Sequence, residues 1–474
     1  MSNTSQASAR INSLLDENSF VEIGAMVTAR ATDFNMDPKA APTDGVITGY
    51  GLIGGSLVYV YGQDASVMGG SIGEMHAKKI INLYDLAMKT GAPVIGLIDS
   101  TGLRLLEATD ALSAFGRIYR RQSMASGVIP QITAVFGSCG GGLALFPTMS
   151  DFTFIESGKG KMFVNSPNAV EGNYVEKLDT SSAAFRSSEC GDVDVVADED
   201  TIYDQIRTLV MMLPENNEEN GAFDECTDDL NRLCSDLSAC YKDANVALSR
   251  IADDQAFYEL KADYAQEMVT GLLRLNGITV GAVANRTEKY NDEGKVDTKY
   301  DAVLTPAGCL KAADFINFCD AFDIPVITLT NVSGFESTMC AEKKISKAAA
   351  KLAYAFANAT VPKINVITGN AFGSAYVVMN SKSLGADMTF AWDSASVGMM
   401  DADMAAKLLF EKEDNKAELT ASYKEMQTSV ESAARRGYID TIIKAEDTRK
   451  YVIGALEMLF TKREERPNKK HGAI

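Results

Sequence analysis

Histidine is almost absent from this chain. Of its 474 residues only His76 and His471 are histidines, and His471 lies in the polar tail "KREERPNKKHGAI". Histidine is the side chain most often used for general acid–base catalysis, so an enzyme built on this sequence must take its proton chemistry from carboxylates, the backbone or a cofactor. The eight cysteines form no CxxC pair, and zinc sites need such spacing or several histidines. The sequence therefore argues against a bound metal, and we expect reduced thiols in the core and loops.

Positive charge and long apolar runs are also scarce. Lys and Arg total 45 against 64 Asp and Glu, which leaves a net charge of −19. Nucleic acids and anionic membrane surfaces attract basic proteins, so neither is expected as a direct partner. No apolar run approaches the roughly 20 residues that span a bilayer, and the polar opening "MSNTSQASARINSLLDE" does not resemble a signal peptide. The expected location is the cytoplasm, with membrane association only through partner subunits.

The sequence repeats itself. "GAPVIGLIDSTGLRL" (91–105) parallels "DIPVITLTNVSGFES" (323–337), and "ITAVFGSCGGGLALF" (132–146) parallels "INVITGNAFGSAYVV" (364–378), always 232 positions on. Matched order and spacing over such distances indicate two copies of one unit. Because the length exceeds the usual size of one domain, we predict an N-terminal domain over 1–215, an acidic linker over 216–244 and a C-terminal domain over 245–474.

Each copy alternates short apolar strands with longer helices. In the first copy the pattern predicts strands at 57–63, 93–99 and 131–137. It also predicts helices at 74–90, ended by Gly91, and at about 107–126. Buried strands alternating with helices indicate an α/β fold in which both faces of the sheet are covered.

In both copies a strand ends in glycines before a helix. At such a turn the first backbone N–H groups of the helix are free, and a ligand oxygen can approach them closely because no Cβ intervenes. Gly141 and Gly142 would donate in the first copy, and Ser374 and Ala375, or their neighbour Gly373, in the second. Two such pockets suit oxyanion stabilisation. The alternative is that these glycines only allow tight packing of strand against helix; neither a dinucleotide fingerprint nor a P-loop is present.

Longer motifs give the chain a family resemblance. It resembles the carboxyltransferase subunit of biotin-dependent acyl-CoA carboxylases and decarboxylases, the family of propionyl-CoA carboxylase β and methylmalonyl-CoA decarboxylase α. The motifs that carry it are "TDFNM" (32–36), "DGVITGYG" (44–51), "GGSIGEMHAKKI" (69–80), "DLAMKTGAPVIGLIDS" (85–100), "SGVIPQI" (126–132), "VTGLLRLNG" (269–277), "KAADFINFCDAFDIP" (311–325), "AKLAYAFANATVPKINVIT" (350–368) and "SLGADMTFAW" (383–392). The resemblance implies two tandem crotonase-like (ClpP/crotonase) ββα-superhelix domains.

The resemblance also implies a mechanism and partners. CO₂ would pass between carboxybiotin, held on a separate carrier protein, and the α-carbon of a short-chain acyl-CoA. The first domain would bind the coenzyme A thioester through its glycine turn and the second would bind biotin. Binding residues carried over from the family are Gly102, Arg104 and Gly140 for the first domain, and Gly373 and Val377 for the second. The chain itself would carry neither biotin nor metal. Expected partners are a biotin carboxyl carrier protein, a biotin carboxylase subunit or membrane decarboxylase subunits, and five further copies in a hexamer with active sites between subunits.

Several positions depart from the family pattern and leave alternatives open. Thr101 and Leu103 replace small residues of the coenzyme A site, and Ser374 replaces a glycine. Arg104 either meets a coenzyme A phosphate or pairs with Glu107. Val377 favours the decarboxylase direction slightly. Two other functions remain open: a biotin-independent hydratase or hydrolase using the carboxylates of Glu107 and Asp110, and an inactive scaffold subunit.

Overall fold

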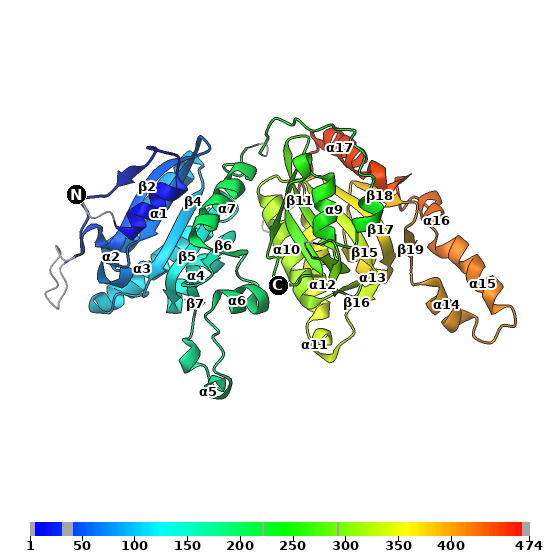
Figure 1. Ribbon diagram of the computed structural model, residues 1–474, viewed down its shortest axis with the longest axis horizontal. Coiled ribbons are helices and arrows are strands. Elements are labelled where there is room, and N and C mark those ends of the chain that lie inside the picture. The colour runs from blue at the N-terminus through cyan, green and yellow to red at the C-terminus, as the bar shows by residue number, and fades with distance from the viewer. Residues whose placement is uncertain (1–4, 31–40, 220–221, 292, 467–474) are drawn as a thin grey trace. The chain divides into compact units, whose positions relative to one another are not determined.

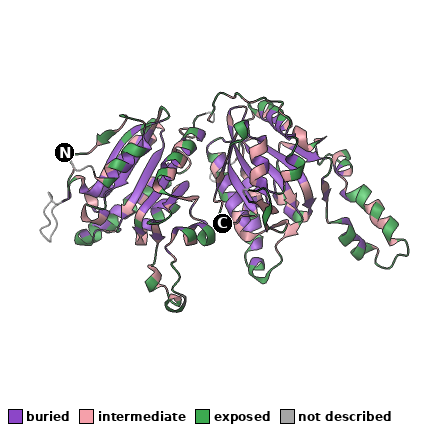
Figure 2. Cartoon of the chain, viewed as in Figure 1, coloured by how far each residue is buried: buried purple, intermediate pink, exposed green. Residues whose placement is uncertain are grey.

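The computed structural model describes residues 5–30, 41–219, 222–291 and 293–466. The chain divides into two compact units, Met1–Ala222 and Phe223–Ile474. Figure 1 shows that each unit is built around one twisted sheet with helices against it, and Figure 2 shows that the strands form the buried part of each. No helix among the described residues is both long and apolar enough to cross a bilayer.

The first unit has an eight-stranded mixed sheet in the order β1-β2-β3-β4-β5-β6-β8, with β7 paired to β5. Its strands are β1 (Val21–Ile23), β2 (Val46–Ile53), β3 (Ser56–Gln63), β4 (Val94–Ser100), β5 (Gln131–Gly140), β6 (Phe152–Glu156), β7 (Lys161–Phe163) and β8 (Val195–Ala197). Its helices are α1 (Gln6–Leu14), α2 (Glu74–Thr90), α3 (Ala108–Ala125), α4 (Leu145–Thr148), α5 (Asn173–Glu176), α6 (Ala183–Phe185) and α7 (Glu199–Met212). Helix α2 packs with α3, and α1 packs with α7.

The second unit repeats this sheet. Its order is β9-β10-β11-β15-β17-β18-β20, with β19 paired to β17. The strands are β9 (Phe257–Leu260), β10 (Met268–Leu275), β11 (Ile278–Asn285), β15 (Val326–Val332), β17 (Lys363–Phe372), β18 (Met388–Trp392), β19 (Ser396–Gly398) and β20 (Thr441–Ile443), beside the small pairs β12 (Glu288–Tyr290) with β13 (Val296–Lys299) and β14 (Val303–Leu304) with β16 (Gly334–Phe335). The helices are α8 (Leu237–Cys240), α9 (Ala244–Ile251), α10 (Pro306–Ala321), α11 (Met339–Glu342), α12 (Ile345–Asn358), α13 (Gly373–Val378), α14 (Ala402–Leu409), α15 (Lys416–Tyr423), α16 (Val430–Arg435) and α17 (Thr448–Leu459). The predicted duplication is confirmed, since strand order and pairing are the same in both units.

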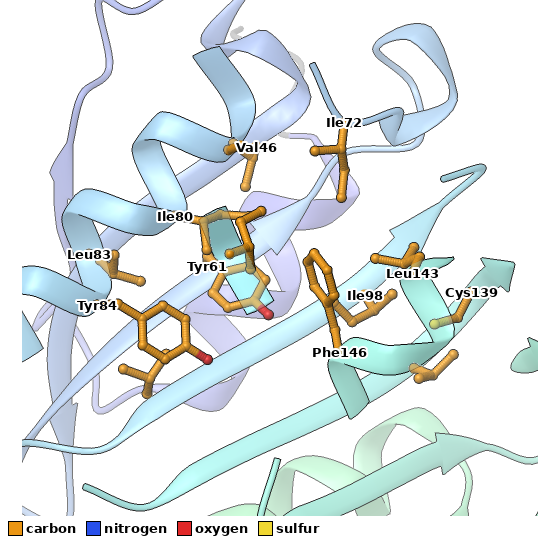
Figure 3. Close-up of a cluster of buried hydrophobic side chains, with 14 of the residues drawn as sticks. Val46, Tyr61, Ile72, Ile80, Leu83, Tyr84, Ile98, Cys139, Leu143 and Phe146 are labelled. Atoms are coloured by element: carbon orange, nitrogen blue, oxygen red, sulfur yellow. The ribbon is translucent and has the colours of Figure 1, made fainter. Parts of the chain in front are cut away.

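The first helix of the pattern shows why local prediction succeeded. Helix α2 buries Ile80, Leu83 and Tyr84, which recur at helical spacing. It ends at Gly91, which adopts φ 67° and donates its N–H to the Ala87 carbonyl, as a C-terminal glycine cap does. Figure 3 shows these three side chains directed into the same cluster as Tyr61 and Phe146.

The two cores differ where the sheets are otherwise equivalent. In the first unit Tyr61 lies against Gly96, whose added Cβ would stand 2.4 Å from the tyrosine oxygen. In the second unit the matching strand position holds Thr328, whose hydroxyl donates to Asn365 at 3.0 Å. Thr330 donates to the same amide oxygen at 2.8 Å, and Asn380 donates to Thr328. All four of these polar side chains are buried, so the second core contains a hydrogen-bonded amide–hydroxyl cluster.

Residues on either side of the unit boundary are structured. Helix α7 begins after Asp198, whose side chain accepts from the Thr201 N–H. Within the acidic segment 216–244, Cys234 and Leu237 are buried in the core of the second unit. This part of the segment packs as a piece of that unit.

A half-buried carboxylate in the first unit makes its stability depend on pH. Asp151 accepts from the Gln131 N–H, and burial together with the neighbouring Asp194 raises its pKa from 3.8 to about 7. Between these values the folded chain holds a proton that the unfolded chain releases, so stability falls as pH rises through this window. We expect Asp151→Asn to remove this fall. Relative to the wild type, the variant should gain about 2 kcal/mol of unfolding free energy between about pH 5 and pH 8.

Urea unfolding followed by circular dichroism measures this effect, because the single tryptophan, Trp392, lies in the second unit. The duplicated position supplies the control. Asp387 accepts from the Lys363 N–H and also pairs with Lys462 at 2.8 Å. Asp387→Asn should therefore cost stability, because it removes the pair with Lys462. Parallel pH curves for wild type and Asp151→Asn would contradict the prediction.

Candidate active site

The glycine turn of the first unit has the build expected of an anion or oxyanion pocket. After β5, Gly141 adopts φ 66° and starts a single turn of 3₁₀ helix, Gly141–Ala144. The first N–H groups of a helix have no carbonyl partner within it, and the preceding Gly140 has no side chain to cap them. A Cβ at Gly141 would meet no atom within 4 Å. The N–H groups of Gly141 and Gly142 thus lie in a turn that is open on one side.

Aromatic side chains anchor this turn from behind. The Tyr119 hydroxyl donates to the Gly142 carbonyl at 2.6 Å. The rings of Tyr119, Phe115 and Phe146 pack against one another at centroid distances of 5.4–5.9 Å. A Cβ at Gly142 would stand 2.8 Å from the Tyr119 oxygen, so glycine is needed here for close packing, whereas at Gly141 it is needed for the positive φ.

The loop after β4 lies beside the turn. Gly102 adopts φ 97°, and its added Cβ would stand 3.2 Å from the Gly140 carbonyl oxygen. The structure therefore brings Gly102, Gly140, Gly141 and Gly142 together. Thr101 and Leu103, the two departures from the family pattern, stand on this same loop. Thr101 is exposed, and Leu103 pairs with Ile72 through an isolated β-bridge.

Arg104 does not join this group. It is 2% exposed, forms ion pairs with Asp44 and, at 2.9 Å, with Glu107, and donates to the Ser71 carbonyl at 2.6 Å. Of the two roles considered from the sequence, the structure contains the pairing with Glu107. We assign Arg104 a structural role, in which it ties together the loops before β2, before α2 and before α3.

The titratable side chains near the turn are committed to structure. Glu107 also accepts from the Glu74 N–H at 2.6 Å and is buried. Asp110 pairs with Arg30 at the surface. His76 is fully buried, and burial lowers its pKa to about 3. Glu107 and His76 are thus engaged within the fold, and Asp110 in a surface ion pair.

Asp99 and Asn331, which were not predicted from the sequence, explain the earlier glycine of each turn motif, Gly137 and Gly369. A Cβ at Gly137 would stand 2.1 Å from the Asp99 carboxylate, and one at Gly369 would stand 2.5 Å from the Asn331 amide oxygen. Asp99 pairs with Arg10 at 3.1 Å, and Asn331 accepts from the Asn370 N–H at 3.0 Å. The equal spacing of these residues from the glycines was the available signal.

The second unit has a matching turn. After β17, Gly373 adopts φ 64° and begins α13, and Phe372 before it provides no capping side chain. Ser374 is exposed, whereas Ala375 is 1% exposed. Val377 is 41% exposed on the same helix. The predicted donors Ser374 and Ala375 and their neighbour Gly373 thus all lie in the first turn of α13.

A pocket of about 390 Å³ lies next to this second turn. Its lining residues are Tyr376, Ser383, Val397, Gly398, Met399, Gln427, Ala433, Arg436 and Tyr438. Tyr376 belongs to α13, and burial raises its pKa to about 12, so its hydroxyl stays protonated at neutral pH. Among the described residues, no group of three or more His, Cys, Asp or Glu side chains is arranged to hold a metal ion.

Comparison with known proteins places the chain in a family. Residues 3–474 match the carboxyl transferase domain. Methylmalonyl-CoA decarboxylase subunit alpha of Veillonella parvula is 39% identical over 99% of this chain and 92% of its own length. Propionyl-CoA carboxylase beta chain of Roseobacter denitrificans is 39% identical over 99% of this chain and 93% of its own length. The transcarboxylase 12S hexamer, solved with methylmalonyl-coenzyme A bound, superposes with a TM-score of 0.90 at 36% identity, covering 98% of this chain and 92% of that one. The two-domain crotonase-like fold is confirmed, and the chain belongs to the carboxyl transferase domain family as an acyl-CoA carboxyltransferase.

Proposed function

We propose that this chain moves a carboxyl group between biotin on a separate carrier protein and the α-carbon of a short-chain acyl-CoA of the propionyl or methylmalonyl type. The observation that carries the proposal is the pair of turns at Gly141 and Gly373. Each turn follows an equivalent strand, has a glycine at positive φ and lacks a side-chain cap. Two separate sites for a carbonyl oxygen suit a reaction between two carbonyl compounds.

In this proposal the first unit binds the thioester. The N–H groups of Gly141 and Gly142 hold its oxygen and stabilise the negative charge that develops there when the α-proton is lost. A preorganised donor of this kind is worth about 3 kcal/mol of barrier. Gly102 and Gly140 form the adjacent wall, where the absence of side chains lets the acyl end approach. The predicted domain 1–215 would therefore be the one that binds acyl-CoA.

The second unit, with the predicted domain 245–474, binds the carrier's biotin. The residues present fit that group: a cyclic urea needs a donor for its oxygen and a pocket for its two rings. Gly373, Ser374 and Ala375 provide backbone N–H groups, and the neighbouring pocket is about 390 Å³ in volume. When bound, biotin would supply the nitrogen that carries the carboxyl group and that accepts the α-proton once this group has left. Val377 stands at the exposed edge of α13 and would contact the bound group there.

The partners follow from the same proposal. The chain would act with a biotin carboxyl carrier protein, and as one of six copies, as in the transcarboxylase 12S hexamer. The relatives include both a decarboxylase subunit and carboxylase subunits, so the chain would pair either with membrane decarboxylase subunits or with a biotin carboxylase. Val377 favours the pairing with membrane decarboxylase subunits.

Label transfer tests the proposal. The purified chain is incubated with a biotin carrier protein that bears a radiolabelled carboxyl group and with acetyl-, propionyl- and butyryl-CoA in turn. We expect label in the thioester fraction, most rapidly with propionyl-CoA. Hydration of an enoyl-CoA without biotin would instead support the hydratase reading. Binding of both substrates with no transfer in either direction would identify a scaffold subunit.

A further inference from the structure

The pocket beside Gly373 contains a cation with no acidic partner. Arg436 donates from Nη1 to the Gln427 amide oxygen at 3.0 Å and from Nη2 to the Met426 carbonyl at 2.8 Å. Both acceptors are neutral. Within the described residues Arg436 forms no ion pair with an Asp or Glu side chain, and the pocket lining includes no carboxylate.

The two hydrogen bonds hold Arg436 in place without neutralising it. A guanidinium has five N–H donors in a planar fork that matches the two oxygens of a carboxylate. Gln427 and Met426 use two of these donors, which leaves others for a ligand. Tyr438, on the same segment, also lines the pocket and is 51% exposed. The pocket therefore provides a fixed positive charge at its rim.

The pocket adjoins the second turn, although the turn residues Gly373 and Ser374 do not line it. Tyr376 lines it from α13, and the Met399 carbonyl oxygen would stand 3.3 Å from a Cβ at Gly373. A ligand whose oxygen accepts from the turn N–H groups can therefore extend toward Arg436. A neutral cyclic urea would leave the guanidinium without a counter-charge, whereas a urea that bears a carboxylate on nitrogen would supply one.

We propose that Arg436 binds the carboxylate of an N-carboxylated cyclic urea in this pocket, and so determines that the second unit takes the charged form of the group in preference to the uncharged form. The inference rests on the proposed function, because it assigns the pocket beside Gly373 to the carrier's biotin. No bond forms or breaks at Arg436, which acts through charge and two-pronged hydrogen bonding. A charge-assisted pair of this kind is roughly twice as strong as a neutral hydrogen bond.

Equilibrium binding tests the inference without turnover. The probes are 2-oxoimidazolidine-1-acetate, a stable cyclic urea with a carboxylate on its nitrogen arm, and the matching acetamide, measured by titration calorimetry with the full chain. We expect the acetate to bind about tenfold more tightly than the acetamide. Arg436→Met should abolish the difference, and Arg436→Lys should restore part of it because lysine keeps the charge without the fork. Arg435→Met is the matched control: Arg435 is the adjacent exposed arginine, it does not line the pocket, and its loss should leave the preference intact.

Kinetics separate this inference from the proposed function. In Arg436→Met the KM for the carboxylated carrier should rise about tenfold, while the KM for acyl-CoA stays unchanged. A wild-type chain that transfers no carboxyl group refutes the proposed function, and the binding experiment still decides the role of Arg436. Equal affinity of the wild type for both probes, no binding of either, or a preference that survives in Arg436→Met would each overturn the inference. Far-UV circular dichroism verifies that each variant is folded.

Discussion

An alanine at Gly141 should lower the kcat of carboxyl transfer to propionyl-CoA about a hundredfold. The added methyl group has room, because no atom lies within 4 Å of its position. That space is where the thioester oxygen must approach the N–H groups, so the methyl group displaces the oxygen and not the protein. Loss of one oxyanion donor costs about 2.7–4 kcal/mol in other enzymes. Steady-state kinetics with the carboxylated carrier and propionyl-CoA provide the measurement.

Gly55 is the matched control for this prediction. It lies in the turn between β2 and β3, adopts φ 87°, and likewise has no atom within 4 Å of an added Cβ. Alanine at either position therefore costs a similar amount of backbone strain, about 1 kcal/mol. We expect equal small losses of stability, with activity lost only in Gly141→Ala. Full activity in Gly141→Ala, or an equal loss in Gly55→Ala, would remove the first turn from the reaction.

Replacing Arg104 by methionine should lower the unfolding free energy of the first unit by about 3–5 kcal/mol. The substitution leaves the carboxylates of Asp44 and Glu107 buried without their shared cation. Burial already raises the pKa of Asp44 in spite of the opposing charge of Arg104. Without that charge both acids face the full desolvation cost, and the loops before β2 and α3 lose their common hydrogen-bond donor. Urea unfolding followed by circular dichroism measures the loss.

Arg121 in α3 provides the comparison. It pairs with Asp85 at 2.7 Å, but both side chains are partly exposed, and such surface pairs contribute about 0–1 kcal/mol. Arg121→Met should therefore have little effect. Adding Asp44→Asn and Glu107→Gln to Arg104→Met should recover part of the stability, because the buried charges are gone. No recovery in the triple variant would show that packing of the arginine, and not its charge, stabilises the unit.

Features with a local or periodic cause were predicted from the sequence. Helix α2 was predicted over its full length, because the glycine that ends it is adjacent in sequence. The strands at 57–63, 93–99 and 131–137 were predicted to within a few residues, because each is a short apolar run between turn signals. The spacing of 232 residues revealed the duplication, since pairs such as Gly141 and Gly373 kept their distance while other positions changed.

Features that depend on distant residues were not predictable. Arg104 could not be assigned between a ligand and an ion pair, because Asp44 lies 60 positions away in sequence. The pocket beside the second turn combines Tyr376, Met399 and Arg436, and nothing in the sequence indicates that these segments meet. Short helices such as α4 and α13 have too few residues to show a period. Helix α4 is positioned by aromatic packing, and α13 is positioned by the strand β17 that precedes it.

The cluster of Thr328, Thr330, Asn365 and Asn380 bears on how two like halves fold in one chain. Equivalent sheets with the same strand order invite exchange, in which a strand of one half inserts into the other during folding. A β17 placed in the first sheet would bury the Asn365 amide opposite Gly96 and beside Ile98, away from the side chains of Thr328, Thr330 and Asn380. A buried amide left without partners costs about 1–3 kcal/mol. These four side chains thus favour the pairing of each strand within the sheet of its own half.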